Sequence, residues 1–235
     1  MSCPNGPPRP EEAGSLAMVL SALGPGAARV LFYPTLLYTL VREWLPGSQR
    51  PWFSRVDRSV LLGALPLRGR SRQLVEEQNV RGVVTMNEEY ETRFLCYSSE
   101  EWAEMGVEQL RLSTVDLTGV PSLENLHKGV EFVMKHRESG NSVYVHCKAG
   151  RFRSATMVAA YLIQLHHCTP QQAIATILKI RPHIIIREKQ MKLLEDFHTC
   201  VTAGTPAQQE PPKIQQGKNK PTHNVQNHPL KTSGS

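Results

Sequence analysis

Apolar residues in the middle of the chain gather in short runs that alternate with longer amphipathic stretches. Four runs have the length and apolar character of buried strands: 60–63, 82–86, 107–112 and 143–146. Six stretches carry helical spacing or helix-start signals: 72–79, 98–106, 122–138, 155–165, a segment that begins at 169, and 187–201. Strands that alternate with helices in this way predict an α/β fold, with a mostly parallel central sheet flanked by helices.

Composition divides the chain of 235 residues into three parts. Residues 51–202 contain the alternating strands and helices, and this length buries a core without disulfides or a structural metal. Residues 203–235 are rich in Gln, Pro, Lys, Asn and Ser without periodicity, which is typical of a disordered tail. Residues 1–50 precede the domain, and we interpret them as a targeting and membrane-associating segment.

The N-terminal segment has the composition of a mitochondrial import sequence, because residues 13–42 contain Arg29 and Arg42 but neither Asp nor Glu. Its apolar stretch, 30–41, spans twelve residues, whereas a helix needs about 20 to cross a bilayer. The stretch can lie in a membrane interface or pack on the domain, and the sequence does not choose between the two. In the first case four aromatic residues reach headgroup depth: Phe32, Tyr33, Tyr38 and Trp44.

Charge and cysteine content exclude several classes of function. The net charge of +6 lies partly in the tail, and no basic stripe is interleaved with aromatic residues, so we expect no nucleic-acid partner. The positive charge suits anionic substrates or an anionic lipid surface. Five cysteines without repeated close spacing argue against a disulfide framework and against a zinc site. We therefore expect no metal and no cofactor, and the sequence identifies no protein partner.

The most informative motif follows the last predicted strand, where residues 146–154 read HCKAGRFRS. A strand, a glycine-containing loop and a helix in this order direct backbone N–H groups and the helix dipole at one point, which is an anion site. Positive charge near Cys147 lowers the pKa of its thiol, and Arg153 offers a planar fork for two phosphate oxygens. The motif predicts cysteine-dependent phosphoryl transfer. The simpler alternative is a buried structural cysteine before an ordinary helix.

In this interpretation Cys147 attacks phosphorus and forms a cysteinyl phosphate. The phosphate-binding loop consists of Lys148, Ala149, Gly150, Arg151, Phe152 and Arg153. His146 helps to orient the loop and keep the thiolate, and the Ser154 hydroxyl stabilises the sulfur as it leaves. A general acid must protonate the leaving group, and Asp116 is the candidate because a parallel sheet brings its loop beside the Cys147 strand. The alternative for Asp116 is an ordinary turn-forming residue.

The motif from Cys147 to Arg153 resembles that of the cysteine-dependent protein-tyrosine and dual-specificity phosphatase superfamily. Further stretches resemble its mitochondrial branch, which converts phosphatidylglycerophosphate to phosphatidylglycerol on the route to cardiolipin: 28–38, 85–93 and 109–116. The resemblance implies one dual-specificity-phosphatase-like domain, with Cys147 as nucleophile, Arg153 as phosphate clamp and Asp116 as general acid. It also implies a location at the inner mitochondrial membrane, facing the matrix.

An acidic loop precedes the second half of the domain and consists of Glu88, Glu89, Tyr90 and Glu91. The resemblance implies that this loop shapes the headgroup pocket. Its carboxylates would be unhelpful facing the phosphate, so we expect them to pair Arg151 or Lys148, or to accept hydrogen bonds from glycerol hydroxyls. The same two cations suit a substrate that carries a second phosphate. The alternative is an ordinary solvated loop.

One residue departs from the family pattern, which commonly has a small residue where this chain has Phe152. The ring can project outward, or narrow the pocket against the acidic loop.

The leading hypothesis is a metal-independent lipid phosphomonoesterase acting on phosphatidylglycerophosphate. One alternative is a dual-specificity protein phosphatase for phosphotyrosine and phosphoserine or phosphothreonine. Another is a phosphate-binding protein that Phe152 has weakened catalytically.

Overall fold

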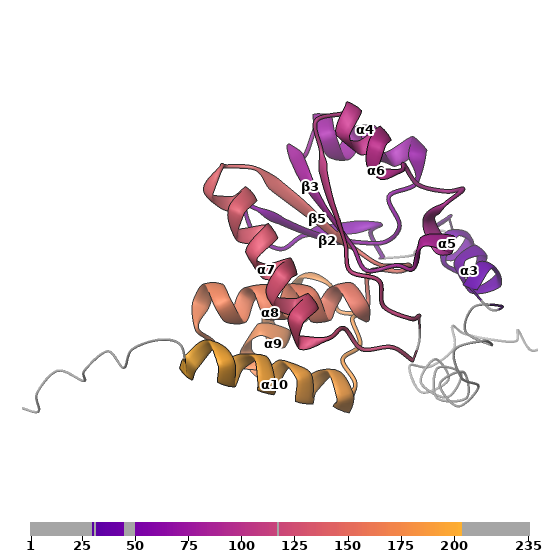
Figure 1. The fold of residues 1–235 in the computed structure, drawn as a ribbon. Helices are drawn as coiled ribbons and strands as arrows, with labels where there is room; N and C mark the ends of the chain where they lie inside the picture. The colour runs from indigo at the N-terminus through magenta and orange to yellow at the C-terminus, as the bar shows by residue number, and fades with distance from the viewer. Residues whose placement is uncertain (1–29, 31, 45–49, 117, 204–235) are drawn as a thin grey trace, which may run out of the picture. The chain divides into compact units, whose positions relative to one another are not determined.

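The computed structural model describes residues 30, 32–44, 50–116 and 118–203 (Figure 1). Five strands form one sheet in the order β1-β2-β5-β3-β4. Their bounds are Phe53–Arg55 for β1, Val60–Gly63 for β2, Val80–Thr85 for β3, Glu108–Arg111 for β4 and Ser142–His146 for β5. Only β1 runs antiparallel to its neighbour, and the other three strand pairs are parallel. The predicted α/β fold with a mostly parallel sheet is confirmed.

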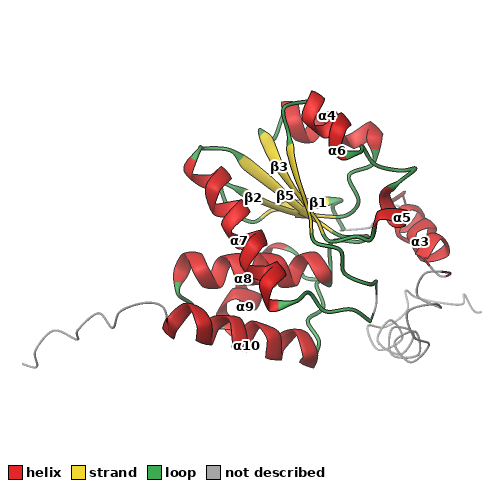
Figure 2. Cartoon of the chain, viewed as in Figure 1, coloured by secondary structure: helices red, strands yellow, loops and turns green. Residues whose placement is uncertain are grey.

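Helices cover both faces of the sheet (Figure 2). On one face lie α4 and α6, which span Arg68–Glu76 and Ser99–Glu104. On the other face the sheet is contacted by α7 and α8, Leu123–Glu138 and Arg153–His166, and on these two helices pack α9 and α10, Pro170–Ile180 and Glu188–Ala203. Successive strand residues point to opposite faces, so Val84 joins the core under the four-helix face and Val83 joins the core beneath α4 and α6.

The described part of the N-terminal segment forms helix α3, Phe32–Trp44, which packs on the domain with one face. Phe32 and Leu36 are buried in a cluster with Trp52 and Leu65. Phe32 therefore cannot reach a lipid headgroup, contrary to that expectation, because its ring is enclosed between α3 and the domain. The opposite face of α3 is apolar and exposed, with Leu37 62% and Val41 52% accessible. Tyr33 and Tyr38 are also exposed, whereas the Trp44 side chain lies outside what the structure describes.

Three local predictions were wrong in detail. The helix predicted at 72–79 is α4, which begins earlier, at Arg68, and ends at Glu76, and the chain then turns through Asn79, with a left-handed φ of 52°, before β3. Strand β1 was missed, since three residues are too few to show a period. The acidic loop contains a helical turn, α5, which spans Glu89–Thr92 and begins with a capping box between Glu88 and Glu91.

Within the described residues, no helix is both long enough and apolar enough to cross a membrane. The import-sequence prediction rests mainly on residues 1–29, and the predicted tail is almost entirely residues 204–235; both ranges lie outside the described residues.

Candidate active site

The phosphate loop joins the buried end of β5 to the start of α8, as the sequence predicts. Gly150 has a φ of 66°, and a Cβ there would lie 2.5 Å from the carbonyl carbon and oxygen of Gly63. Any other residue would therefore be strained and would also push the loop away from β2. The glycine sets how closely the loop approaches the neighbouring strand.

Cys147 lies at the base of this loop with its side chain buried. The Ser154 hydroxyl donates a hydrogen bond to Sγ at 3.1 Å. Burial alone would raise the pKa of the thiol. The positive charge of Arg153, the Ser154 hydroxyl and the backbone N–H groups of Ser154 and Arg151 outweigh burial, and the pKa of Cys147 falls below its ordinary value. The site thus favours the thiolate, which is the nucleophilic form.

Arg153 is fixed in place by a buried network of acceptors. Glu91, which is 0% exposed, receives a bidentate pair from Nη1 and Nη2, at 2.9 Å each. Nη1 also donates to the Thr114 carbonyl at 2.7 Å, and Nη2 donates to Asp116 Oδ1 at 2.9 Å. Burial by itself would lower the pKa of Arg153, but the carboxylates of Asp116 and Glu91 raise it above its ordinary value. The guanidinium is therefore charged and oriented.

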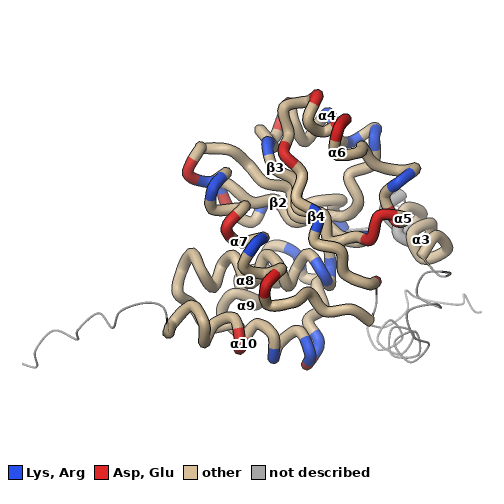
Figure 3. The backbone as a smooth tube through the Cα atoms, viewed as in Figure 1, with Lys and Arg blue, Asp and Glu red and all other residues tan. Residues whose placement is uncertain are grey.

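The carboxylates of the acidic loop do not pair as we expected from the sequence. Figure 3 marks this loop in red at α5, beside α3. Glu91 turns inward to Arg153 rather than to Arg151 or Lys148, because the helical turn of α5 directs it to the sheet end. Glu88 begins that turn, and its backbone N–H donates to Glu91 Oε1 at 3.1 Å. The loop is therefore not simply solvated, although Glu89 is exposed.

Tyr90 completes this loop and connects it to α3. Its ring packs edge-on against Phe32, with centroids 5.8 Å apart, and its carbonyl accepts a hydrogen bond from the Tyr33 hydroxyl at 3.2 Å. Burial and the nearby carboxylates of Glu91 and Glu88 raise the pKa of the Tyr90 hydroxyl, which stays protonated. Helix α3 and the acidic loop thus form one wall of the site.

Asp116 lies between two cations at the mouth of the phosphate loop. It is 5% exposed, and its carboxylate pairs with Lys148 Nζ as well as with Arg153. Lys148 also donates to Thr35 Oγ1 of α3 at 2.9 Å. Strand β4, which precedes the Asp116 loop, is separated from β5 by β3. The loop crosses the end of β3, where the Thr114 N–H donates to the Met86 carbonyl at 3.1 Å, and so brings Asp116 to the phosphate loop.

His146 supports the loop without charge. Its Nε2 lies 2.9 Å from Thr85 Oγ1, which also accepts a hydrogen bond from Gln109 Nε2 at 2.7 Å. Burial lowers the pKa of His146 to about 3, so the ring is neutral at neutral pH. It can orient the loop as expected, while the positive charge that favours the Cys147 thiolate comes from Arg153.

Comparison with known protein families agrees with the cysteine-dependent chemistry of this site. A family model described as the catalytic domain of dual specificity phosphatases matches residues 70–200. The chain belongs to the dual-specificity phosphatase family.

Two curated relatives and one crystal structure refine that placement. Phosphatidylglycerophosphatase and protein-tyrosine phosphatase 1 from Homo sapiens is 64% identical over 182 residues, 77% of this chain and 90% of the relative. Phosphatidylglycerophosphate phosphatase PTPMT1 from Arabidopsis thaliana is 38% identical over 188 residues, 77% of this chain and 54% of the relative. The crystal structure of PTPMT1 in complex with PI(5)P is 63% identical with a TM-score of 0.64, covering 65% of this chain and 98% of that one.

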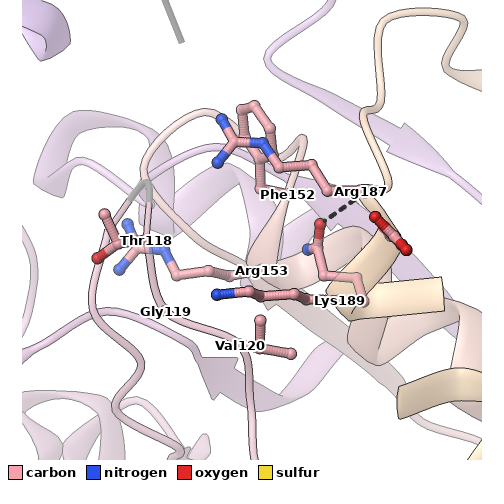
Figure 4. Close-up of a pocket in the computed structure, with 9 residues that line it drawn as sticks. Thr118, Gly119, Val120, Phe152, Arg153, Arg187 and Lys189 are labelled. Atoms are coloured by element: carbon pink, nitrogen blue, oxygen red, sulfur yellow. Dashed lines mark hydrogen bonds between the residues drawn. The ribbon is translucent and has the colours of Figure 1, made fainter. Parts of the chain in front are cut away.

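In this dual-specificity phosphatase Phe152 takes neither of the two orientations considered above. Its half-buried ring lies near two guanidinium groups, with the ring centre 5.8 Å from that of Arg151 and 4.9 Å from that of Arg187. Figure 4 shows the ring beside Arg187, lining a cavity that contains no residue of the acidic loop. The backbone at the start of α8 directs the ring toward the α10 side, so it does not narrow the pocket against Glu88 or Glu91.

Arg181 is a structural contributor to the phosphate loop that the sequence did not indicate. It is buried, and its Nε and Nη2 donate to the carbonyls of Gly150 and Ala149 at 2.9 and 3.3 Å. Nη1 holds Ser54 Oγ of β1 at 3.1 Å. These bonds hold the carbonyls of Gly150 and Ala149 away from the centre of the loop, so that the loop N–H groups can point to a bound anion. A single arginine in an apolar stretch gives no such signal in the sequence.

Proposed function

We propose that this phosphatase hydrolyses the terminal phosphate of phosphatidylglycerophosphate and releases phosphatidylglycerol, by way of a cysteinyl phosphate. The observation that carries the reaction class is the carboxylate of Asp116, held at the same loop as Cys147 and Arg153. The lipid class is supported by the human and Arabidopsis relatives, whose names carry that activity.

Substrate binding rearranges the charges of the site. The oxygens of a phosphate monoester accept hydrogen bonds from the loop N–H groups and from Arg153, whose Nη2 now holds Asp116 Oδ1. Both hydrogens of Nη2 are already donated, one to Glu91 Oε2 and one to Asp116 Oδ1, so a phosphate oxygen that binds Nη2 must displace one of these carboxylates. Glu91 is also held by Nη1, so Asp116 is the one displaced. Phosphate binding therefore releases Asp116 from Arg153 and makes it available to the leaving oxygen.

The chemistry then takes two steps. Asp116, once released from Arg153, takes up a proton from solvent. The Cys147 thiolate attacks phosphorus in line, the P–O bond to the glycerol breaks, and Asp116 gives this proton to the departing oxygen. Water next attacks the cysteinyl phosphate, Asp116 takes a proton from it, and the S–P bond breaks. The sulfur leaves as a thiolate, which the Ser154 hydroxyl stabilises by its hydrogen bond. Arg153 and the loop N–H groups stabilise charge on the phosphoryl oxygens in both steps.

The test compares hydrolysis of phosphatidylglycerophosphate in mixed vesicles with hydrolysis of a phosphotyrosine peptide, both with a metal chelator present. We expect a higher kcat/KM on the lipid. A preference for the peptide would instead support a protein phosphatase, an activity that the name of the human relative also carries. Turnover on neither substrate would indicate a phosphate-binding protein weakened by Phe152.

We also propose that α3 holds the active site at an anionic membrane surface. Its exposed apolar face includes Leu37 and Val41, and its buried face contacts the site through Phe32 and Thr35. Full-length protein should sediment with vesicles that contain anionic lipid, and Leu37→Glu should reduce that fraction. Equal sedimentation of both proteins would contradict this placement of α3.

The proposed location is the matrix side of the inner mitochondrial membrane, where phosphatidylglycerol feeds cardiolipin formation. The acid-free composition of residues 13–42 supports import into mitochondria. A chain tagged at its C-terminus should resist protease in intact mitochondria and in mitoplasts, and should become sensitive after detergent. A tag that stays in the cytosol would contradict this proposal.

A further inference from the structure

A cavity of about 260 Å³ opens beside the phosphate loop, on the side of α10. It shares Arg153 with the catalytic cluster, and Phe152, Arg187 and Lys189 line it opposite Gly119. Figure 4 shows the Lys189 side chain extending from α10 across the cavity toward Arg153. Small-molecule sites usually measure about 300–1,000 Å³, so this one suits a headgroup rather than a whole lipid.

Arg187 is positioned before any ligand arrives. Its guanidinium lies 4.9 Å from the centre of the Phe152 ring, within the range of cation–π attraction. Its backbone N–H donates to Gln190 Oε1 at 3.0 Å, and Gln190 Nε2 donates to Thr156 Oγ1 of α8 at 2.7 Å. The segment that carries Arg187 is thus tied to the helix that carries Arg153.

The charges of this cavity differ from those of the catalytic cluster. Arg153 is balanced by Glu91 and Asp116, and Asp116 also balances Lys148. Lys148, which we expected to serve a second phosphate, is therefore already engaged. Arg187 and Lys189 bring two further cations to the cavity, against one carboxylate in its lining, that of Glu188. In addition, Nε of Arg153 is buried without a hydrogen-bond partner among the described residues.

We propose that this cavity is a second anion subsite, in which Arg187 and Lys189 bind the second phosphate of a substrate whose terminal phosphate lies over Cys147. The inference rests on the proposed function, and it names the residues that select a glycerol headgroup with phosphate at both ends. Phe152 holds Arg187 in place, so the ring contributes to recognition instead of blocking it. Binding energy from the second phosphate then raises kcat/KM for such substrates over simple monoesters.

The test uses two soluble substrates that differ in the second phosphate: glycerol 3-phosphate, and glycerophosphoglycerol phosphate, which is the deacylated lipid headgroup. The readout is kcat/KM for glycerophosphoglycerol phosphate divided by kcat/KM for glycerol 3-phosphate. Because both substrates are soluble, membrane binding does not affect this ratio. Arg187→Gln combined with Lys189→Gln should lower this ratio about tenfold to a hundredfold, the size expected when charge-assisted hydrogen bonds are lost. Phe152→Leu keeps an apolar side chain but loses the cation–π contact, and it should lower the ratio about threefold.

Lys192→Gln is the matched control, because it removes the same charge from α10 at a position outside the cavity lining. It should leave the ratio unchanged, and Lys189→Arg should preserve most of it. If the double variant leaves the ratio unchanged, whether or not both kcat/KM values fall, the second subsite is wrong, and the phosphatase assignment still stands. Failure of the unmodified protein to hydrolyse either compound would instead contradict the proposed function.

Discussion

The two sides of the phosphate loop hold their charges in different ways. On one side Arg153, Glu91, Asp116 and Lys148 form a buried network in which each charge has a partner. On the other side Arg187 stacks on Phe152 at the edge of a cavity, with both side chains partly exposed. Chemistry requires fixed geometry, whereas recognition of a headgroup requires an accessible cation. Substitutions on the buried side should therefore cost both activity and stability, and those on the open side should change only substrate preference.

The largest effect is expected at the nucleophile. Cys147→Ser should abolish turnover, because a hydroxyl is not deprotonated near neutral pH and cannot attack phosphorus. Binding of inorganic phosphate should persist, since Arg153 and the loop N–H groups remain. Calorimetry with phosphate and a turnover assay measure the two properties separately. Substantial hydrolysis by this variant would remove Cys147 from its role.

Asp116→Ala should have the second largest effect on turnover. It should lower kcat on a glycerol-type phosphate by about 10²–10⁴-fold, the usual contribution of a general acid. An aryl phosphate should lose less, because a nitrophenolate leaves without needing a proton. A structural role for Asp116 would instead produce equal losses on the two substrates.

Glu91→Gln tests the buried side through stability. Among the described residues it leaves the guanidinium of Arg153 with Asp116 as its remaining ion-pair partner. The free energy of unfolding should therefore fall by about 3 kcal/mol, the lower end of the usual range for breaking a buried pair. Glu89→Gln is the control, since Glu89 lies in the same helical turn but is exposed, and its effect should stay within about 0.5 kcal/mol. Similar unfolding midpoints in urea for both variants would contradict the importance of the buried pair.

The smallest expected effect is a shift in pH dependence. Ser154→Ala removes a hydrogen bond that favours the thiolate, so the pKa of Cys147 should rise toward its ordinary value. The acid limb of kcat/KM should then move up by about one to two pH units. His146 stays neutral through this range, so His146→Asn should not move the limb in the same way. A profile for Ser154→Ala that coincides with that of the unmodified protein would contradict this account of the thiolate.

The parts of the site that the sequence predicted are those encoded locally. The residues from Cys147 to Ser154 are consecutive between a strand and a helix, so the loop between these two elements is enough to bring them around one anion site. Asp116 could be assigned only with a parallel sheet assumed, and even then the strand order was not predictable. The partner of Arg153 lies 62 residues away at Glu91, and the pairing depends on a helical turn that the acidic sequence did not indicate.

The open side was predicted least well, for the same reason. The direction of the Phe152 ring depends on the start of α8 and on where α10 begins, which are tertiary facts. Arg181 reaches Gly150 across 31 residues without any periodic signal. The fold itself was predictable because apolar periodicity spans many residues. The prediction missed short elements such as β1, which are too short to show a period.

The central claim is that Cys147 carries the phosphate taken from the lipid, and rapid acid quenching tests it most directly. Protein mixed with phosphatidylglycerophosphate should release phosphatidylglycerol in a burst equal to the enzyme concentration, with a phosphate adduct on the peptide that contains Cys147. The Asp116→Ala variant, slowed in breaking down that adduct, should accumulate more of it with an aryl phosphate. Steady hydrolysis of the lipid with no phosphorylated Cys147 at any time point would contradict the account.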